Sequence, residues 1–188
     1  MDALHHVIDA PAAVALPFEI RDKGNGRGVF ATRSIAAGTR LFSAEDCADN
    51  LERKRFPKLT SAQVLDLPGP VRATFLRFAH NASPDEIRGT FHPEWVQHPV
   101  NFIEHSCDPN AGYDGADGII ALIRIAAGEE IRIDYGTHSF SFDHEFSCGC
   151  RSPLCRGKVT RHDWPQLVRV GLRLPTFMRA EVSRELWG

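Results

Sequence analysis

Apolar and polar residues alternate with the two-residue period of β-strands in the first well-patterned part of the chain. Phe18-Glu19-Ile20-Arg21 and Val29-Phe30-Ala31-Thr32 each show this alternation, and the glycine-rich segment 23–28 lies between them. Ala37-Gly38 has the composition of a tight turn, and another short strand follows it. This part of the chain is therefore predicted to consist of short strands joined by turns.

The pattern becomes helix-like over residues 46–97. Thr60-Ser61-Ala62-Gln63 has capping-box spacing ahead of apolar residues, and Pro70 is typical of the first turn of a second helix. Ser83-Pro84-Asp85-Glu86 indicates the start of a third helix. The face of the second helix that we expect to be buried carries Val71, Phe75, Phe78 and Ala79. We therefore expect a helical insert between two β-rich parts.

Strand patterns return after residue 110. The run Ile119-Ile120-Ala121-Leu122-Ile123 is typical of a buried strand, and Ile131, Ile133 and Tyr135 fall on one face of a later strand. Tyr135 would end that apolar face. We therefore expect its hydroxyl at the rim of whatever the face encloses.

The composition limits the number of domains. With 188 residues, of which 43% are hydrophobic and 24% charged, the chain has the size of one globular domain with appendages. The predicted division is an N-terminal arm over 1–17, a domain over 18–136 that contains the insert, a cysteine-bearing segment over 137–158 and a helical tail over 159–188.

The charge and the cysteines exclude several classes of protein. A formal net charge of −2 does not favour nonspecific binding to nucleic-acid phosphates. The sequence has neither the charged start and apolar core of a signal peptide nor an apolar run of about twenty residues that would span a membrane. Five cysteines, four of them in a metal-like arrangement, fit a reducing compartment better than a disulfide framework. We expect an intracellular protein, cytoplasmic by default, without membrane or direct nucleic-acid partners.

Polar chemistry is concentrated in the segment 101–110, which contains Glu104, His105 and Cys107. Three further cysteines cluster later in the chain, and tetrahedral zinc sites usually have four Cys or His ligands. The predicted ligands of one structural Zn²⁺ are Cys107, Cys148, Cys150 and Cys155. Disulfides are the alternative if the chain is secreted. Cys47 is left over and is expected to be a small buried hydrophobe.

The glycines of the first turn have two interpretations. Gly24, Gly26 and Gly28 permit positive φ angles and a close approach of the backbone to a ligand. A hairpin or bulge without a ligand explains them equally well. A phosphate-binding loop is not expected, because a strand rather than a helix follows the glycines.

Four motifs in this order resemble the SET-domain protein lysine methyltransferases that carry a post-SET zinc motif. The motifs are Gly26 to Ala31, Asn101 to Asn110, Gly128 to Gly136 and the cluster Cys148, Cys150 and Cys155. The resemblance covers roughly residues 18–158, and the insert falls where that family has its variable segment. It implies a mostly β fold of the α+β class. This fold is a pseudoknotted β-clip of small sheets with a zinc-stapled post-SET segment.

The resemblance also implies a site. S-adenosylmethionine would be the methyl donor, Tyr135 and His105 would be the catalytic positions, and the zinc would be structural. The positions that match the family's cofactor-binding residues are Gly26, Arg27, Gly28, Glu104, His105, Tyr135 and Gly149. Glu104 stands where the family usually has asparagine, and Ile133 stands where an aromatic residue is frequent.

The implied activity is methyl transfer from S-adenosylmethionine to the ε-amine of a lysine in a protein substrate. Two other interpretations stay open. One is a SET-fold enzyme that acts on a small metabolite amine or has altered chemistry, which Glu104 motivates. The other is a non-enzymatic zinc-stapled binding module, against which Tyr135 argues because binding alone needs no tyrosine at the channel.

Overall fold

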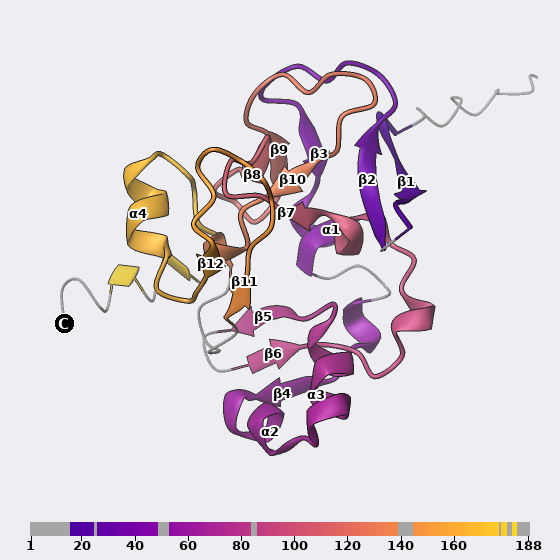
Figure 1. Ribbon diagram of the computed structural model, residues 1–188, viewed down its shortest axis with the longest axis vertical. Helices are drawn as coiled ribbons and strands as arrows, with labels where there is room; N and C mark the ends of the chain where they lie inside the picture. Colours follow the sequence, from indigo (N-terminus) through magenta and orange to yellow (C-terminus); the bar gives the residue numbers. More distant parts are fainter. Residues whose placement is uncertain are drawn as a thin grey trace, which may run out of the picture.

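The chain is rich in short strands that form several small sheets (Figure 1). The computed structural model describes residues 16–24, 26–48, 53–83, 86–138, 145–176, 178–179 and 182–183. Within these residues the strands form two three-stranded and three two-stranded sheets. The prediction of a mostly β fold of small sheets is confirmed. No helix in this described part is both long and apolar enough to cross a membrane.

The first two strands form the predicted hairpin around the glycine-rich turn. β1 (Phe18–Asp22) pairs antiparallel with β2 (Arg27–Ala31), from Phe18 opposite Ala31 to Asp22 opposite Arg27. The Lys23 amide donates a 2.8 Å hydrogen bond to the carbonyl of Gly26 and closes the turn. The inward residues of the hairpin join the main core, where Val29 and Ala31 are fully buried.

A three-stranded sheet lies beside the hairpin and forms the centre of the main core. Its strands run in the order β3 (Arg40–Phe42), β9 (Ile119–Ala121) and β8 (Ala111–Tyr113), and both pairs are antiparallel. The short helix α1 (Ala44–Ala48) follows β3. Other residues without exposed surface in the main core are Val96, Ala111, Ala121, Ile125 and Ile131.

Two segments that are distant in the sequence cross at the centre of the molecule. β7 (Glu104–His105) pairs parallel with β10 (Arg132–Ile133), so that Glu104 lies opposite Arg132. The buried Asn110 fixes this crossing: its Nδ2 donates to Glu129 Oε1 at 2.9 Å and to the Glu130 carbonyl at 2.8 Å, and its Oδ1 accepts from the Arg132 amide at 2.9 Å. The chain thus has the crossing that a pseudoknotted fold requires.

The insert forms a lobe of its own at the bottom of Figure 1. It contains a sheet in the order β4 (Lys58–Thr60), β6 (Glu86–Arg88) and β5 (His80–Ser83), together with α2 (Ser61–Asp66) and α3 (Gly69–Leu76). Val64, Phe75 and Ile87 are its buried core. The lobe therefore has a small hydrophobic core separate from the main one.

The helix starts predicted in the insert were right in two cases. Thr60 is the N-cap of α2, and its side chain and that of Gln63 form the expected capping box. Pro70 lies in the first turn of α3. Of the predicted buried face, Phe75 is fully buried, and Ala79 packs partly buried against the same core just beyond the helix. Val71 is 40% exposed, and the helix ends before Phe78, whose ring packs edge-on against Phe102 of the main core at 5.6 Å.

The third predicted helix of the insert was wrong. Ser83 ends β5 and Glu86 begins β6, so this segment is a β-hairpin; Pro84 and Asp85 lie outside the described residues. β6 pairs with β4 as well as with β5, and Ile87 between them is 3% exposed. Pairing on both edges satisfies the backbone of β6 and buries its apolar residue, which outweighs a local helix-start signal.

The cysteine-bearing segment and the tail fold back onto the main core. β11 (Phe146–Ser147) pairs antiparallel with β12 (Lys158–Val159), and α4 (Trp164–Arg169) follows. Trp164, Leu174 and Met178 form a third small core. Beyond α4, residues 176, 178–179 and 182–183 of the tail are also α-helical. Short 3-10 segments are present at Arg53–Arg55, Pro93–Trp95, Pro99–Phe102 and Tyr135–Thr137.

A buried ion pair ties these C-terminal segments to the crossing. The Arg156 guanidinium donates to both oxygens of Asp134, at 2.6 and 2.7 Å, and its Nε donates to Asp163 at 2.8 Å. The Asp134 side chain has no exposed surface. Since Asp134 directly follows β10 and Asp163 directly precedes α4, one guanidinium joins three parts of the chain.

Removing Arg156 is expected to destabilise the fold strongly. Arg156→Ala would leave the Asp134 carboxylate buried without its counter-ion, and breaking a buried pair in this way costs about 3 kcal/mol or more. Chemical denaturation measures the loss. The matched control is Arg169→Ala, which removes an exposed guanidinium from the end of α4 and should change the free energy of unfolding by less than about 0.5 kcal/mol. Equal effects of the two variants would contradict the role given to the ion pair.

Candidate active site and metal centre

Two cavities meet beside the crossing. The hairpin-side cavity, of about 570 Å³, is lined by the β1–β2 turn, residues 93–94 and residues 101–104. The insert-side cavity, of about 530 Å³, is lined by the insert lobe, the end of β8 and residues 133–138. The residues that line both cavities are Arg77, Phe78, Asn101, Ile103 and Tyr135. The tyrosine predicted to be catalytic therefore lies in the wall between two separate spaces.

The hairpin-side cavity offers carboxylates and a guanidinium. Asp22, Glu94 and Glu104 supply the carboxylates. The Arg27 guanidinium lies 3.9 Å from the centre of the Phe102 ring and donates to the Val96 carbonyl at 3.1 Å, so it is held flat against the wall. Carboxylates attract cationic groups, and a guanidinium attracts a carboxylate. These residues fit a ligand that carries charges of both signs, as S-adenosylmethionine does.

Glu104 belongs to a small charge cluster at the glycine turn. Its Oε2 lies 3.4 Å from Lys23 Nζ, and the same ammonium contacts Glu130 Oε1 at 2.6 Å. The Glu104 side chain is 47% exposed, whereas that of Glu130 is 8% exposed. A Cβ at Gly28 would lie 2.5 Å from Glu130 Oε1, so Gly28 is required for the packing of this cluster. Glu104 keeps free surface toward the cavity.

Tyr135 begins the 3-10 turn that follows β10. Its hydroxyl donates a 2.7 Å hydrogen bond to the carbonyl of Ile103. Burial, with a smaller contribution from Glu104 and Glu130, raises the pKa of Tyr135 well above its ordinary value. The phenol therefore stays protonated at neutral pH and acts as a hydrogen-bond donor, not as a base. Its position at a cavity rim is as expected, although it lies just beyond the strand that carries Ile133.

His105 connects the tyrosine to the cysteines from behind the cavity wall. Its Nδ1 accepts a 3.1 Å hydrogen bond from the Tyr135 amide, so the proton of the neutral ring is on Nε2. Nε2 lies 3.3 Å from Cys107 Sγ and donates to it. Burial lowers the pKa of His105, which favours this neutral form. The ring thus orients the tyrosine backbone.

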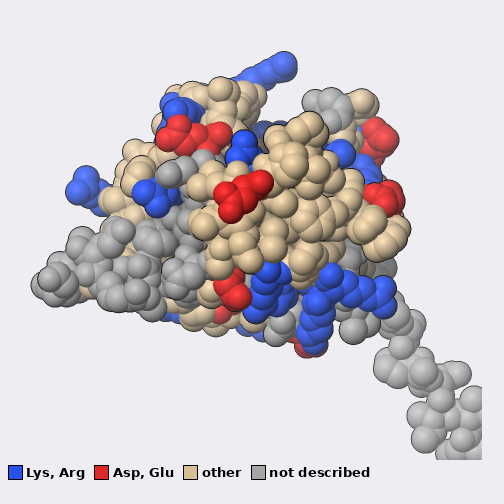
Figure 2. Space-filling model, turned by 90° about the horizontal axis from the view of Figure 1, so that it is seen from below, with Lys and Arg blue, Asp and Glu red and all other residues tan. Residues whose placement is uncertain are grey.

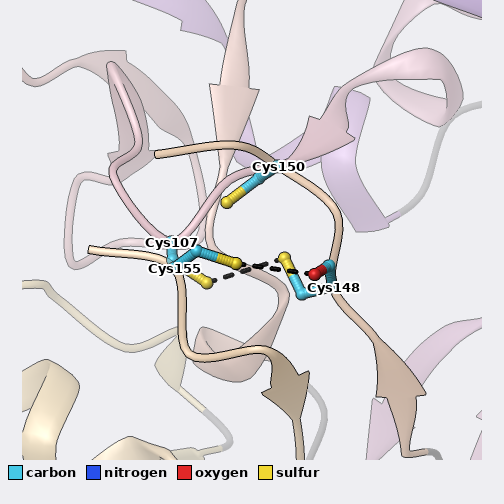
Figure 3. Close-up of side chains that lie close together, drawn as sticks. All are labelled: Cys107, Cys148, Cys150 and Cys155. Carbon is cyan, nitrogen blue, oxygen red and sulfur yellow. Dashed lines mark hydrogen bonds between the residues drawn. The ribbon is translucent and has the colours of Figure 1, made fainter. Parts of the chain in front are cut away.

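The four cysteines predicted to bind zinc come together (Figure 3). Their sulfur atoms all lie within 4.8 Å of one another, and Cys107 Sγ is 3.7 Å from Cys148 Sγ. Zn–S bonds of about 2.3 Å in a tetrahedron place sulfur atoms about 3.8 Å apart, so this spacing fits zinc. The ligand set joins the stretch containing Cys107 to the loop between β11 and β12, which carries Cys148, Cys150 and Cys155.

The fifth cysteine is separate from the cluster. Cys47 in α1 is 6% exposed, and burial raises the pKa of its thiol to about 12. A thiol in this state is an unreactive apolar side chain, in agreement with the expectation.

The predicted cofactor-binding residues divide into two groups. Gly26, Arg27, Glu104 and Tyr135 line the hairpin-side cavity. Gly28, His105 and Gly149 are absent from the linings of both cavities as far as the described residues go. Gly28 and His105 instead support the wall from behind, and a Cβ at Gly149 would meet no atom within 4 Å. Their direct binding of a cofactor stays a prediction.

The sequence did not identify the aromatic group of the insert-side cavity. Tyr113, His138 and Phe146 line this cavity together with Tyr135. The His138 ring lies 5.2 Å from that of Tyr135 and 6.0 Å from that of Tyr113. Tyr135 begins the 3-10 turn whose C-cap is His138, but Tyr113 and Phe146 come from two other elements, so no spacing in the sequence links the whole group. Together they surround the space next to the Tyr135 hydroxyl with aromatic faces.

The stability of the fold is expected to decrease in mild acid because of His138. Burial, followed by the charge of Arg53, lowers the pKa of this ring to about 4, against 6.5 ordinarily. Between these values the unfolded chain binds the proton and the folded chain does not. Stability is therefore lost as the pH falls, by roughly 2 kcal/mol between pH 7 and pH 5.

Denaturation curves of wild type and His138→Gln over this pH range measure that loss. The variant should have a flatter pH dependence. His162→Gln, which removes an exposed histidine, should keep the wild-type slope. Parallel curves for all three proteins would contradict the assignment.

The purified protein is expected to contain one equivalent of zinc. Cys148→Ser should abolish the bound zinc and lower the thermal midpoint, since metal binding to a Cys₄ site contributes directly to folding. Cys47→Ala should retain the metal, because Cys47 lies outside the cluster. Elemental analysis after gel filtration measures both. A metal-free wild type that folds normally would exclude a structural zinc.

A family model identifies the fold that these elements build. The model of the SET domain matches residues 26–136, which is more than half of the chain. SET domains in general are S-adenosylmethionine-dependent lysine methyltransferases. The resemblance drawn from the four motifs is confirmed for the fold and the family. The chain belongs to the SET domain family.

Proposed function

We propose that this protein transfers the methyl group of S-adenosylmethionine to the ε-amine of a lysine in a protein substrate. The observation that carries the proposal is the position of Tyr135 between the hairpin-side and insert-side cavities. Methyl transfer needs a donor site and an acceptor site that meet at the position where the methyl group passes from one to the other. The two cavities supply these sites, and the tyrosine marks that point.

The hairpin-side cavity is the proposed cofactor site. S-adenosylmethionine, when bound, supplies a methyl group activated by a positively charged sulfur. Asp22, Glu94 and Glu104 would attract the cationic groups of this ligand. Arg27, whose guanidinium lies against the Phe102 ring, would suit the ligand's carboxylate.

The insert-side cavity is the proposed lysine site. Its aromatic group of Tyr113, Tyr135, His138 and Phe146 suits the stem and head of a lysine or methyl-lysine side chain. Methyl transfer requires the amine to be neutral, and removal from water lowers the pKa of an amine. The Tyr135 hydroxyl, whose proton goes to the Ile103 carbonyl, would accept a hydrogen bond from the amine N–H and so leave the amine lone pair directed at the methyl group. Correct alignment of reacting groups is worth several kcal/mol of barrier.

The cysteine cluster would act on this chemistry only through structure. Zinc held by four thiolates has no open coordination position. Through Cys107 and His105 it would fix the backbone of Tyr135, because the ring of His105 contacts both. Loss of zinc should therefore disturb the position of the tyrosine.

Tyr135→Phe is expected to reduce methyl transfer at least about 100-fold while changing S-adenosylmethionine affinity by less than about threefold. The variant removes the hydroxyl but keeps the aromatic wall between the cavities. Transfer is measured with tritiated S-adenosylmethionine on a library of lysine-containing peptides and proteins, and affinity by calorimetric titration. Arg169→Ala, an exposed change on α4, should match wild type in both assays.

The outcomes separate the alternatives for the function of the chain. A wild type that binds the cofactor and labels only small amines would replace the protein substrate with a metabolite. A folded wild type that neither binds the cofactor nor labels any amine would leave a zinc-stapled binding module.

A further inference from the structure

The insert-side cavity has a basic wall. Four Lys or Arg side chains line it, whereas Asp117 is the acidic residue of its described lining. The basic residues are Arg53, Lys58, Arg77 and Arg88. Lys58 and Arg88 lie on adjacent strands of the insert sheet, Arg77 follows α3, and Arg53 begins a 3-10 turn. The positive side chains are thus contributed by the insert, whereas Tyr135 follows β10 of the main core.

The central part of the insert is basic, although the insert as predicted over 46–97 is balanced, with seven Lys or Arg and seven Asp or Glu. Residues 53–91 contain seven Lys or Arg and three Asp or Glu, although the formal net charge of the chain is −2. The rest of the chain is therefore acidic overall. Figure 2 shows the molecule from the side of the insert, where Lys and Arg side chains lie at several places, some of them along the lower edge, with Asp and Glu side chains between them.

Two buried histidines, His80 and His138, line the same cavity. Burial is the first cause that lowers the pKa of each ring, and the positive charge of Arg53 acts in the same direction. The charge of Arg88 also lowers the pKa of His80. Both rings are therefore held neutral beside the basic side chains of the wall.

The Arg53 guanidinium is held in place in this wall. Its Nε donates to Asn101 Oδ1 at 2.8 Å, and its Nη1 donates to the carbonyl of Cys47. Asn101 lines both cavities. Arg53 therefore connects the basic wall to the partition that contains Tyr135.

We propose that the insert selects lysines in an acidic sequence context, through the basic wall formed by Arg53, Lys58, Arg77 and Arg88. The proposal rests on the proposed function, because it names the substrate class of that same site. The preferred substrate is a protein segment with Asp or Glu on either side of the target lysine. Such residues complement the wall, and lysines among further basic residues are repelled by it.

The same wall also favours the reactive form of the lysine. A positive potential disfavours an ammonium and so lowers the pKa of the entering amine. Acidic flanking residues bound at the mouth would offset the repulsion during entry. Recognition and activation of the amine thus depend on the same side chains.

The test compares three sets of peptides that have one central lysine and differ only in the flanking residues: Asp and Glu, Ala and Ser, or Arg and Lys. Methyl incorporation is measured with the zinc-loaded full-length protein. At low salt, kcat/KM for the acidic set should exceed that for the basic set at least about tenfold. This ratio of kcat/KM values should become smaller in 0.3 M NaCl, because the Debye length is then only about 6 Å and the charges are screened.

Charge reversals locate the effect. Lys58→Glu and Arg77→Glu should each lower the preference for acidic peptides about threefold or more. The matched control is Arg72→Glu, which makes the same charge change on α3 but lies outside the cavity lining. It should keep the wild-type preference. Because Arg77 also lines the hairpin-side cavity, cofactor affinity is titrated for each variant.

Each outcome decides the proposal. Equal labelling of the three sets, or an equal effect of Arg72→Glu, would overturn the acidic preference and leave the methyltransferase function intact. If no peptide is labelled, anisotropy of fluorescein-labelled peptides in the presence of S-adenosylhomocysteine replaces the activity readout. Tighter binding of the acidic set supports the proposal, and equal binding overturns it. Tighter binding of a DNA duplex than of any peptide would overturn it in favour of a nucleic-acid surface.

Discussion

The parallel pairing of β7 with β10 is the constraint on which the candidate site depends. It brings Glu104 opposite Arg132 and leads the chain directly to Tyr135. Burial fixes the register of the β7–β10 pair, because a shift of one residue would put the charged Arg132 in the buried position of Ile133. The three hydrogen bonds of Asn110 hold the same register from the side. The partition between the two cavities follows from this crossing.

Around the crossing, polar contacts form a chain from the cysteine cluster to the tyrosine. Cys107 accepts from His105, and His105 accepts from the Tyr135 amide. Asp134 receives the Arg156 guanidinium one residue before the tyrosine. These groups have little exposed surface, so each needs its partner to replace the hydrogen bonds to water that it loses on burial. The C-terminal segment is in this way part of the site's support and not an appendage.

The two sides of the site differ in origin and in charge. The hairpin-side cavity uses the β1–β2 turn and β7, which carry carboxylates. The insert-side cavity uses the insert lobe, whose sheet has its own small core and a basic wall. A lobe with a separate core can change its surface without disturbing the crossing. Under the proposed function, this arrangement would let the substrate side vary while the crossing stays the same.

The sequence by itself determined the β1–β2 hairpin, the capping box at Thr60 and the set of cysteines that come together, because each depends on local backbone preferences or on a distinctive ligand type. It failed at Ser83, where pairing of β6 with both neighbouring strands outweighed a local helix signal. Only the tertiary structure decided the bond between Arg156 and Asp134, the placement of His105 behind the wall and the meeting of the two cavities. These features join residues that are distant in the sequence, and such pairings are fixed by the burial and hydrogen bonding of the whole fold.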